Sequence, residues 1–179
     1  MIATCRLSQV AQGTISLILE TIMATTNGGP GASVPPPSIN ILAQYIKDLS
    51  FENPNAPGSF AGSGPAPGVN IKFNVNATPL SNAEFEVALH VEAKAEHEDK
   101  LLFNIELVYS GIFRLMNVPQ EIVQQIVLIE CPRMLFPFAR QIVADAVRNG
   151  GFPPLMIDPV DFAGLYRERF AQQPPNVAQ

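Results

Sequence analysis

Four segments in which apolar and polar residues alternate constrain the fold more than any other feature of this 179-residue sequence. Successive side chains of an extended strand point to opposite faces, so a period of two is typical of strands with one buried face. The segments are residues 41–51, 69–77, 84–96 and 101–113. We therefore predict one four-stranded β-sheet.

The alternation also predicts which residues share a face of each strand. In the first segment the apolar face carries Ile41, Ala43, Tyr45, Leu49 and Phe51, and the polar face carries Asp48, Ser50 and Glu52. The second segment places Val69, Ile71, Phe73 and Val75 opposite polar residues, and the third has a polar face rich in glutamate. The fourth is apolar on parts of both faces, which favours a central or subunit-contacting position.

The links between the segments differ in length. Residues 78–83 and 97–100 are short connections, which favour an antiparallel meander. Residues 52–68 form a long link rich in Pro and Gly, with one aromatic residue, Phe60. Such a link either crosses from one edge of the sheet to the other or acts as a mobile lid.

Helices follow the strands. Pro119 is suited to the first turn of a helix that runs through Ile129, and Pro132 is expected to end that helix. A second helix is predicted over 134–149, with Gly150 and Gly151 as its stop signal. A last helix, 160–172, is expected to begin after Asp158 and Pro159. The fold class is therefore α+β, a four-stranded antiparallel sheet packed on C-terminal helices.

Composition limits the possible functions. A net charge of −5 argues against nucleic acid as a partner and suits a basic protein partner. Cys5 and Cys131 are too few for a disulfide framework or metal site, and burial should raise the pKa of the Cys131 thiol. His90 and His97 belong to no catalytic motif. We expect no enzymatic activity, no cofactor, no metal and no membrane span, since no run of 18 apolar residues occurs.

The ends of the chain differ from its middle. Residues 1–38 are expected to be a disordered or extension N-terminal tail, and the stretch from Met23 is rich in Gly, Pro, Ser and Thr. We expect Met23 to be the natural start. The folded domain is predicted to cover 39–173 and a flexible tail 174–179.

Several sequence motifs occur in the same order and with the same spacing as in a known protein family. They are KDLSFENPNAP (47–57), FEVALHV (85–91), GIF (111–113), ECPRMLFPFAR (130–140) and NGGFPPLMIDPVDFAGLY (149–166). Over about residues 40–170 the chain resembles SecB, the bacterial protein-export chaperone family. The resemblance implies a cytoplasmic homotetramer, assembled as a dimer of dimers, without ATPase activity. It would hold precursor proteins unfolded and deliver them to SecA, the export motor.

The resemblance also implies two binding sites. Client contacts are expected at Phe51, Val69, Ile71, Phe73, Phe103, Phe138, Phe152, Phe162 and Tyr166. Of these, Phe162 and Tyr166 are expected to be anchored in the core at one end and exposed at the other. The basic tail of SecA is expected to meet Asp48, Glu52 and Glu106. The chain departs from the family at Asn104, a position that is often apolar, and in its uncharged C-terminal tail.

Two alternatives stay open. The first is a SecB-like chaperone dedicated to another partner, such as a toxin–antitoxin pair. The second is a small-ligand or enzymatic α+β domain in which residues 52–68 close over an active site. The lack of an acid/base constellation in the sequence argues against the second alternative.

Overall fold

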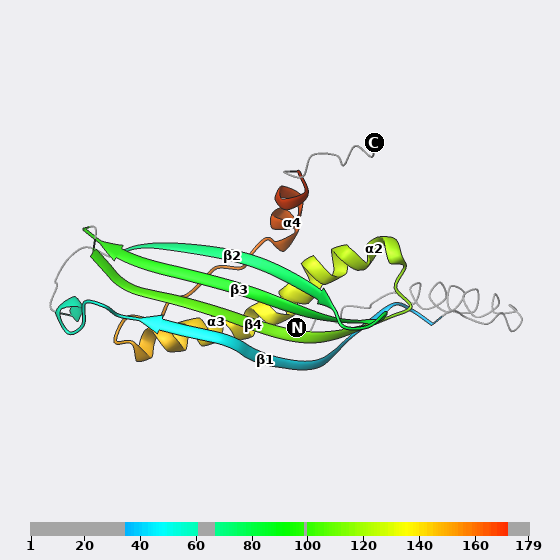
Figure 1. Ribbon diagram of the computed structural model, residues 1–179. Coiled ribbons are helices and arrows are strands. Elements are labelled where there is room, and N and C mark those ends of the chain that lie inside the picture. Colours follow the sequence, from blue (N-terminus) through cyan, green and yellow to red (C-terminus); the bar gives the residue numbers. More distant parts are fainter. Residues whose placement is uncertain (1–34, 61–66, 99, 172–179) are drawn as a thin grey trace, which may run out of the picture. The chain divides into compact units, whose positions relative to one another are not determined.

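The computed structural model describes residues 35–60, 67–98 and 100–171. Its strands form one antiparallel sheet in the order β1-β4-β3-β2 (Figure 1). The strands are β1 (Ser38–Glu52), β2 (Gly68–Pro79), β3 (Glu84–His97) and β4 (Lys100–Met116). The predicted sheet is confirmed, and β4 is central. Because β1 and β2 are opposite edges, the long link between them crosses from one edge to the other.

The faces of β1 differ from the prediction because the strand contains two irregularities. Its register with β4 shifts between Ile41 and Ala43 and again between Ile46 and Asp48. Each shift leaves one extra residue in β1, and an extra residue reverses the face of those that follow. Between the shifts, Tyr45 is paired with Ser110 on the face away from the helices, so the prediction for Ala43 and Tyr45 is wrong.

One continuous 30-residue helix follows the sheet. It comprises α2 (Gln120–Gln125), the π-helical segment η2 (Ile126–Glu130) and α3 (Cys131–Asn149). The prediction that Pro132 ends a helix is therefore wrong. The Cys131 amide bonds to the Ile126 carbonyl, five residues back. Proline has no amide hydrogen and clashes with the carbonyl four residues earlier, and the wide π turn lets the helix continue past it.

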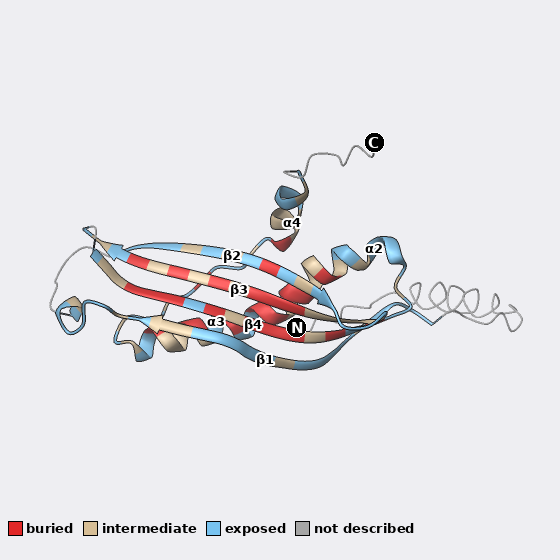
Figure 2. Cartoon of the chain, in the orientation of Figure 1, coloured by how far each residue is buried: buried red, intermediate tan, exposed pale blue. Residues whose placement is uncertain are grey.

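The long helix covers one face of the sheet with a buried stripe. Its members recur at every fourth residue: Cys131, Leu135, Ala139, Val143 and Val147. They pack against the central strands β3 and β4, whose residues alternate between buried and less buried along their length, whereas the edge strands are largely exposed (Figure 2). By length and composition alone this helix could cross a membrane. The core helix of a soluble protein passes the same test, and here the stripe is buried against the sheet.

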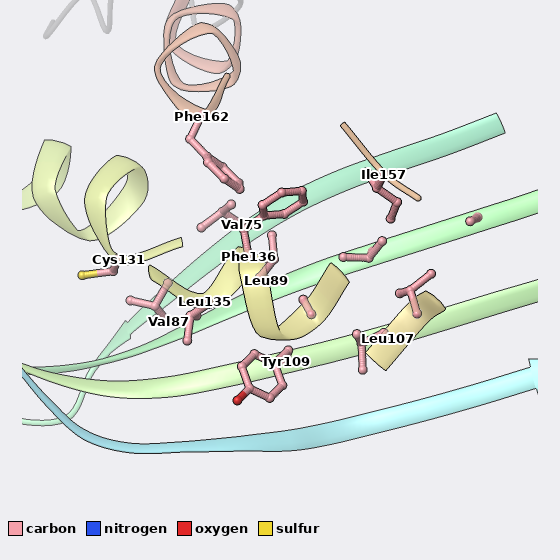
Figure 3. Packing of buried hydrophobic residues seen from close by; sticks show 14 of the residues in the cluster. Val75, Val87, Leu89, Leu107, Tyr109, Cys131, Leu135, Phe136, Ile157 and Phe162 are labelled. Carbon is pink, nitrogen blue, oxygen red and sulfur yellow. The ribbon is translucent and has the colours of Figure 1, made fainter. Parts of the chain in front are cut away.

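The last helix, α4, spans Phe162–Ala171. Its start is capped by Asp161, whose Oδ1 accepts a hydrogen bond from the Gly164 amide at 3.0 Å. The predicted start after Asp158 is therefore wrong. Figure 3 shows Phe162 pointing toward Phe136 of α3 and Val75 of β2, which ties α4 to the core.

From Pro36 onward the described chain belongs to one compact unit. Residues 1–34 and 172–179 lie outside the described residues, as do Cys5, Met23 and the predicted last residue of the final helix. The predicted tails and the expected start at Met23 stay predictions.

Candidate polypeptide-binding and acidic surfaces

An aromatic cluster occupies the end of the sheet where β1 ends and β4 begins. Phe51 stacks on Phe103 with ring centroids 5.8 Å apart, and Phe103 lies 5.1 Å from Phe152. Phe60, from the short 3-10 turn η1 (Gly58–Phe60), lies 5.4 Å from Phe152 and is 51% exposed. Three predicted client-binding residues are thus brought together. Phe60 was missed, although it is the single aromatic residue of the 52–68 link.

Two glycines let the aromatic rings approach the end of α3. A Cβ atom on Gly150 would lie 2.2 Å from Cζ of Phe51, and one on Gly151 would lie 2.7 Å from Cε1 of Phe60. Gly151 also has φ of +90°, which favours glycine. The pair follows the last residue of α3, as predicted, and its lack of side chains leaves the space that the rings of Phe51 and Phe60 occupy.

A groove runs along the inner side of edge strand β2. Its first cavity, about 350 Å³, lies between β2, η2 and α4 and brings Phe73 and Tyr166 together. A second cavity, about 540 Å³, lies further along between the end of β2 and α2 and is lined by Phe85 and Phe170. Leu128 and Arg169 line both cavities. We call this pair of cavities the β2 groove.

The remaining predicted client residues lie in different environments. Val69 is 40% exposed and Ile71 half-buried; both lie on the helix-covered face of β2 but line neither cavity of the β2 groove. Phe162 is only 2% exposed, so the expected exposed end of this side chain is absent and contact with a client would require α4 to move. Tyr166 is half-buried and packs on Phe170 with centroids 4.5 Å apart.

Phe138 lies away from the β2 groove. It is 47% exposed on α3 and stacks on Tyr109 at 6.2 Å. Tyr109 is paired with Ile46 of β1, the opposite edge strand. The same side of β1 exposes further apolar residues, Ile41 and Leu49. We call these four residues, Ile41, Ile46, Leu49 and Phe138, the β1 apolar strip.

The acidic candidates meet on the face of the sheet that the helices leave uncovered. Glu106 is paired with Ser50, midway between Asp48 and Glu52 on β1. Residues paired directly across antiparallel strands share a face, so the three carboxylates form one acidic patch. A shallow groove of about 350 Å³ there is lined by Asp48, Glu106, His90 and Glu92.

Charge pairing distinguishes this acidic patch from its surroundings. Nearby glutamates are neutralised: Glu84 by Arg114 at 2.7 Å, Glu86 by Lys47 at 2.8 Å and Glu92 by Lys94 at 2.9 Å. By contrast, Asp48, Glu52 and Glu106 form no ion pair with any described residue. The patch therefore presents negative charge that an external cation can meet.

Two side chains beside the patch have unusual environments. Asn104 is 7% exposed; its Nδ2 donates to Glu106 at 3.2 Å, whereas its buried Oδ1 has no hydrogen-bond partner. Glu86 accepts hydrogen bonds from Lys47 and from the Tyr45 hydroxyl, which lower the pKa of its carboxyl. The same bond raises the pKa of Tyr45.

Little in the described residues suggests catalysis. Burial raises the pKa of the Cys131 thiol to about 12, as predicted, so this group is protonated at neutral pH and is a poor nucleophile. Among residues 35–60, 67–98 and 100–171, no three His, Cys, Asp or Glu side chains come together as a metal site would require.

The fold is that of a SecB-like chaperone. A SecB-like chaperone from Mycobacterium tuberculosis, solved with a peptide of the HigA1 antitoxin, superposes with a TM-score of 0.53. The comparison covers 68% of this chain and 87% of that chain at 13% sequence identity, so it supports the fold alone.

Sequence comparison identifies the family. The model for preprotein translocase subunit SecB matches residues 33–173. The protein-export protein SecB of Xanthobacter autotrophicus is 62% identical over 151 residues, covering 84% of this chain and 96% of the relative. That of Azorhizobium caulinodans is 60% identical over 155 residues, covering 87% and 96%. The chain belongs to the SecB family of protein-export chaperones, whose members are not enzymes.

Proposed function

We propose that this protein is a cytoplasmic, ATP-independent holdase that keeps precursor proteins unfolded and delivers them to the SecA motor. The observation that carries the client-binding part is the β2 groove, where partly exposed apolar side chains lie beside an unpaired strand edge. Aromatic side chains offer contact area with little sequence selectivity, and a strand edge can bond to any backbone. Both properties suit a chaperone with many clients.

The client-binding residues divide by burial. Phe73 and Tyr166 line the β2 groove, and Val69 and Ile71 have accessible surface further along β2; these four are the first contacts we propose. The aromatic cluster extends the apolar surface, with Phe51, Phe60 and Phe152 accessible and Phe103 as its buried floor. Phe162 supports the groove from below. We assign Phe138 to subunit assembly instead, because it lies in the β1 apolar strip.

The test of client binding compares Tyr166→Ala with Leu80→Ala, which removes a 52% exposed side chain from a turn outside both cavities. We expect Tyr166→Ala to weaken affinity for an unfolded precursor more than it lowers the melting temperature, and Leu80→Ala to leave affinity unchanged. Suppression of aggregation of a slowly folding polypeptide, without nucleotide, provides the activity assay. Unchanged affinity together with a lower melting temperature in Tyr166→Ala would make this residue structural.

The acidic patch is the proposed docking site for the basic tail of SecA. Its three carboxylates lie on the uncovered face, opposite the helices that border the β2 groove, so client and motor would not compete for surface. Attraction between exposed charges weakens as salt screens them. We therefore expect affinity for SecA to fall with ionic strength.

Charge reversal tests the docking site. Asp48→Lys combined with Glu106→Lys should abolish SecA binding at low salt. Glu98→Lys combined with Glu121→Lys changes the net charge equally at exposed sites in the turn after β3 and on α2, and should bind nearly as the wild type does. If the first pair binds SecA as well as the second, the patch is not the docking site.

The proposed assembly is a dimer of dimers. The β1 apolar strip borders a strand edge that no other described strand pairs with, and a second copy of the chain placed there would cover both. Exposed Ile122 on α2 offers a further apolar contact for the second pairing. Sedimentation at micromolar concentration should give a species near four times the 19.4 kDa chain. A monomer would contradict the proposal.

The named relatives favour export over the alternatives. Two of them, both called protein-export protein SecB, share 60–62% identity with this chain, whereas the chaperone solved with an antitoxin peptide shares 13%. A role dedicated to a toxin–antitoxin pair therefore has weaker support. The small-ligand alternative gains none, because the family consists of chaperones.

A further inference from the structure

A side chain of α4 is bonded to the backbone of edge strand β2. Arg169 donates from Nη1 to the carbonyl oxygen of Val75 at 2.7 Å. Among the described strands, β2 is paired along one side only, with β3. Every second residue of an antiparallel edge strand directs its amide and carbonyl away from its partner strand. The Arg169 bond shows that the Val75 carbonyl is reachable from outside the sheet.

This bond lies in the middle of the β2 groove. Arg169 lines both of its cavities, and Val75 lines the one that holds Phe73 and Tyr166. The guanidinium therefore reaches from α4 to the strand edge and, together with Leu128, lies where the two cavities meet. Arg169 has no carboxylate within ion-pair distance among the described residues, so no ion pair competes for its donors.

We infer that the outer edge of β2 around Val75 recognises the backbone of an extended polypeptide, and that Arg169 occupies this edge when no client is bound. A strand added there donates an amide hydrogen to the carbonyl that Arg169 now holds. Residues two positions away, Phe73 and Ala77, have the same backbone orientation and extend the edge in both directions. The occupant is a polypeptide backbone, and the inference rests on the proposed client binding.

The size of the expected effect on client affinity follows from competition between Arg169 and the client backbone for the Val75 carbonyl oxygen. When the competent, open state is only a fraction of the population, the apparent affinity falls by that fraction. This hydrogen bond is partly buried. At the ordinary net strength of a protein hydrogen bond it shifts such an equilibrium by roughly five- to tenfold. Removing the donor should therefore tighten client binding by about that factor.

The experiment measures the dissociation constant of a fluorescent, unstructured apolar peptide for the full-length oligomer. Arg169→Met keeps the length and apolar stem of the side chain but removes its donors, and we expect roughly five- to tenfold tighter binding. Arg167→Met is the matched control, since Arg167 lies 3.6 Å from Asp161 and outside both cavities. It should bind as the wild type does.

A second peptide tests the backbone contact itself. Methylation of alternate amide nitrogens removes donors along one edge of the peptide without removing side chains. We expect this peptide to bind weakly to both proteins and to lose the difference between Arg169→Met and wild type. An equal gain with both peptides would overturn recognition at the strand edge.

Other outcomes have distinct meanings. Weaker binding by Arg169→Met would make Arg169 a client contact, and unchanged affinity with a lower melting temperature would make it structural; each overturns the inference. Larger species in sedimentation of Arg169→Met would assign the edge to a second copy of the chain and also overturn it. A wild-type protein that binds no unfolded peptide would overturn the proposed function, and this inference with it.

Discussion

Gly150→Ala should destabilise the protein when Phe51 is present and stabilise it when Phe51 is removed. Gly150 has φ of −71° and ψ of −2°, which alanine adopts without strain, so the backbone alone favours alanine by about 0.4–1 kcal/mol. However, the new Cβ would lie 2.2 Å and 2.4 Å from Cζ and Cε1 of Phe51. The ring must therefore leave its position on Phe103.

The cost follows from the burial of that ring. Truncating a fully buried phenylalanine costs about 3–5 kcal/mol, and Phe51 is half-buried, so its displacement costs about 2 kcal/mol. Subtracting the backbone gain leaves Gly150→Ala destabilising by roughly 1–2 kcal/mol in the wild type. In the Phe51→Ala background it should stabilise by about 0.5 kcal/mol, which gives a coupling energy of about 2 kcal/mol.

Urea unfolding followed by far-UV circular dichroism provides the measurement, because the chain has no tryptophan. Protomer concentration must be fixed, since the stability of an oligomer depends on it. Gly58→Ala is the control, because no atom lies within 4 Å of its added Cβ. An equal effect of Gly150→Ala in both backgrounds would refute the proposed contact.

Three further predictions concern single side chains. Because the pKa of Glu86 is lowered in the folded protein, this carboxylate stabilises the fold at pH values above the ordinary glutamate pKa of about 4.3, and the stabilisation is lost as the pH falls through the lower folded pKa. Glu86→Gln should therefore make the free energy of unfolding less sensitive to acid. An unchanged pH profile of that free energy would contradict this prediction. Asn104→Leu removes a buried oxygen acceptor that has no partner, so it should raise the free energy of unfolding, measured by urea titration, by about 1 kcal/mol. A lower free energy of unfolding would mean that the lost hydrogen bond to Glu106 contributes more than the unpaired oxygen costs. In a Cys5→Ser background, Cys131 should not react with a thiol reagent at pH 8 until denaturant is added, and rapid labelling of the native protein would contradict its burial.

Strand alternation and turn composition were enough to predict the sheet, because apolar residues on one face of each strand alternate with polar ones and the links β2–β3 and β3–β4 are short. The continuous helix could not be predicted, since Pro132 is normally a helix breaker and only the π turn before it removes the conflict. The start of α4 was misplaced because two aspartates, Asp158 and Asp161, precede it and both are good caps. Local sequence does not rank them; burial of Phe162 in the core fixes the choice.

The sequence predicted the residues of the candidate sites less completely than it predicted the fold. The predicted client residues came from the resemblance to the SecB family, but residue type could not separate Phe162, which is buried, from Phe60, which is half-exposed. Arg169 carries no sequence signal, since an arginine near the end of a helix is ordinarily read as a favourable charge for the helix dipole. Its bond to Val75 joins residues 94 positions apart and requires the fold.

The acidic patch depends on a detail of β1 that the sequence partly signals. Strict alternation fails twice in this strand, at the adjacent apolar pairs Ile41-Leu42 and Tyr45-Ile46. The first register shift falls at Leu42, within the first pair, and the second at Lys47, directly after the second pair. One shift would turn Asp48 and Glu52 under the helices and expose Phe51, whereas two shifts restore the original phase. The prediction was therefore wrong only between the shifts and correct where the acidic residues lie. The same pair of shifts lets one strand present carboxylates to the uncovered face and Phe51 to the aromatic cluster, so β1 connects the two proposed binding surfaces.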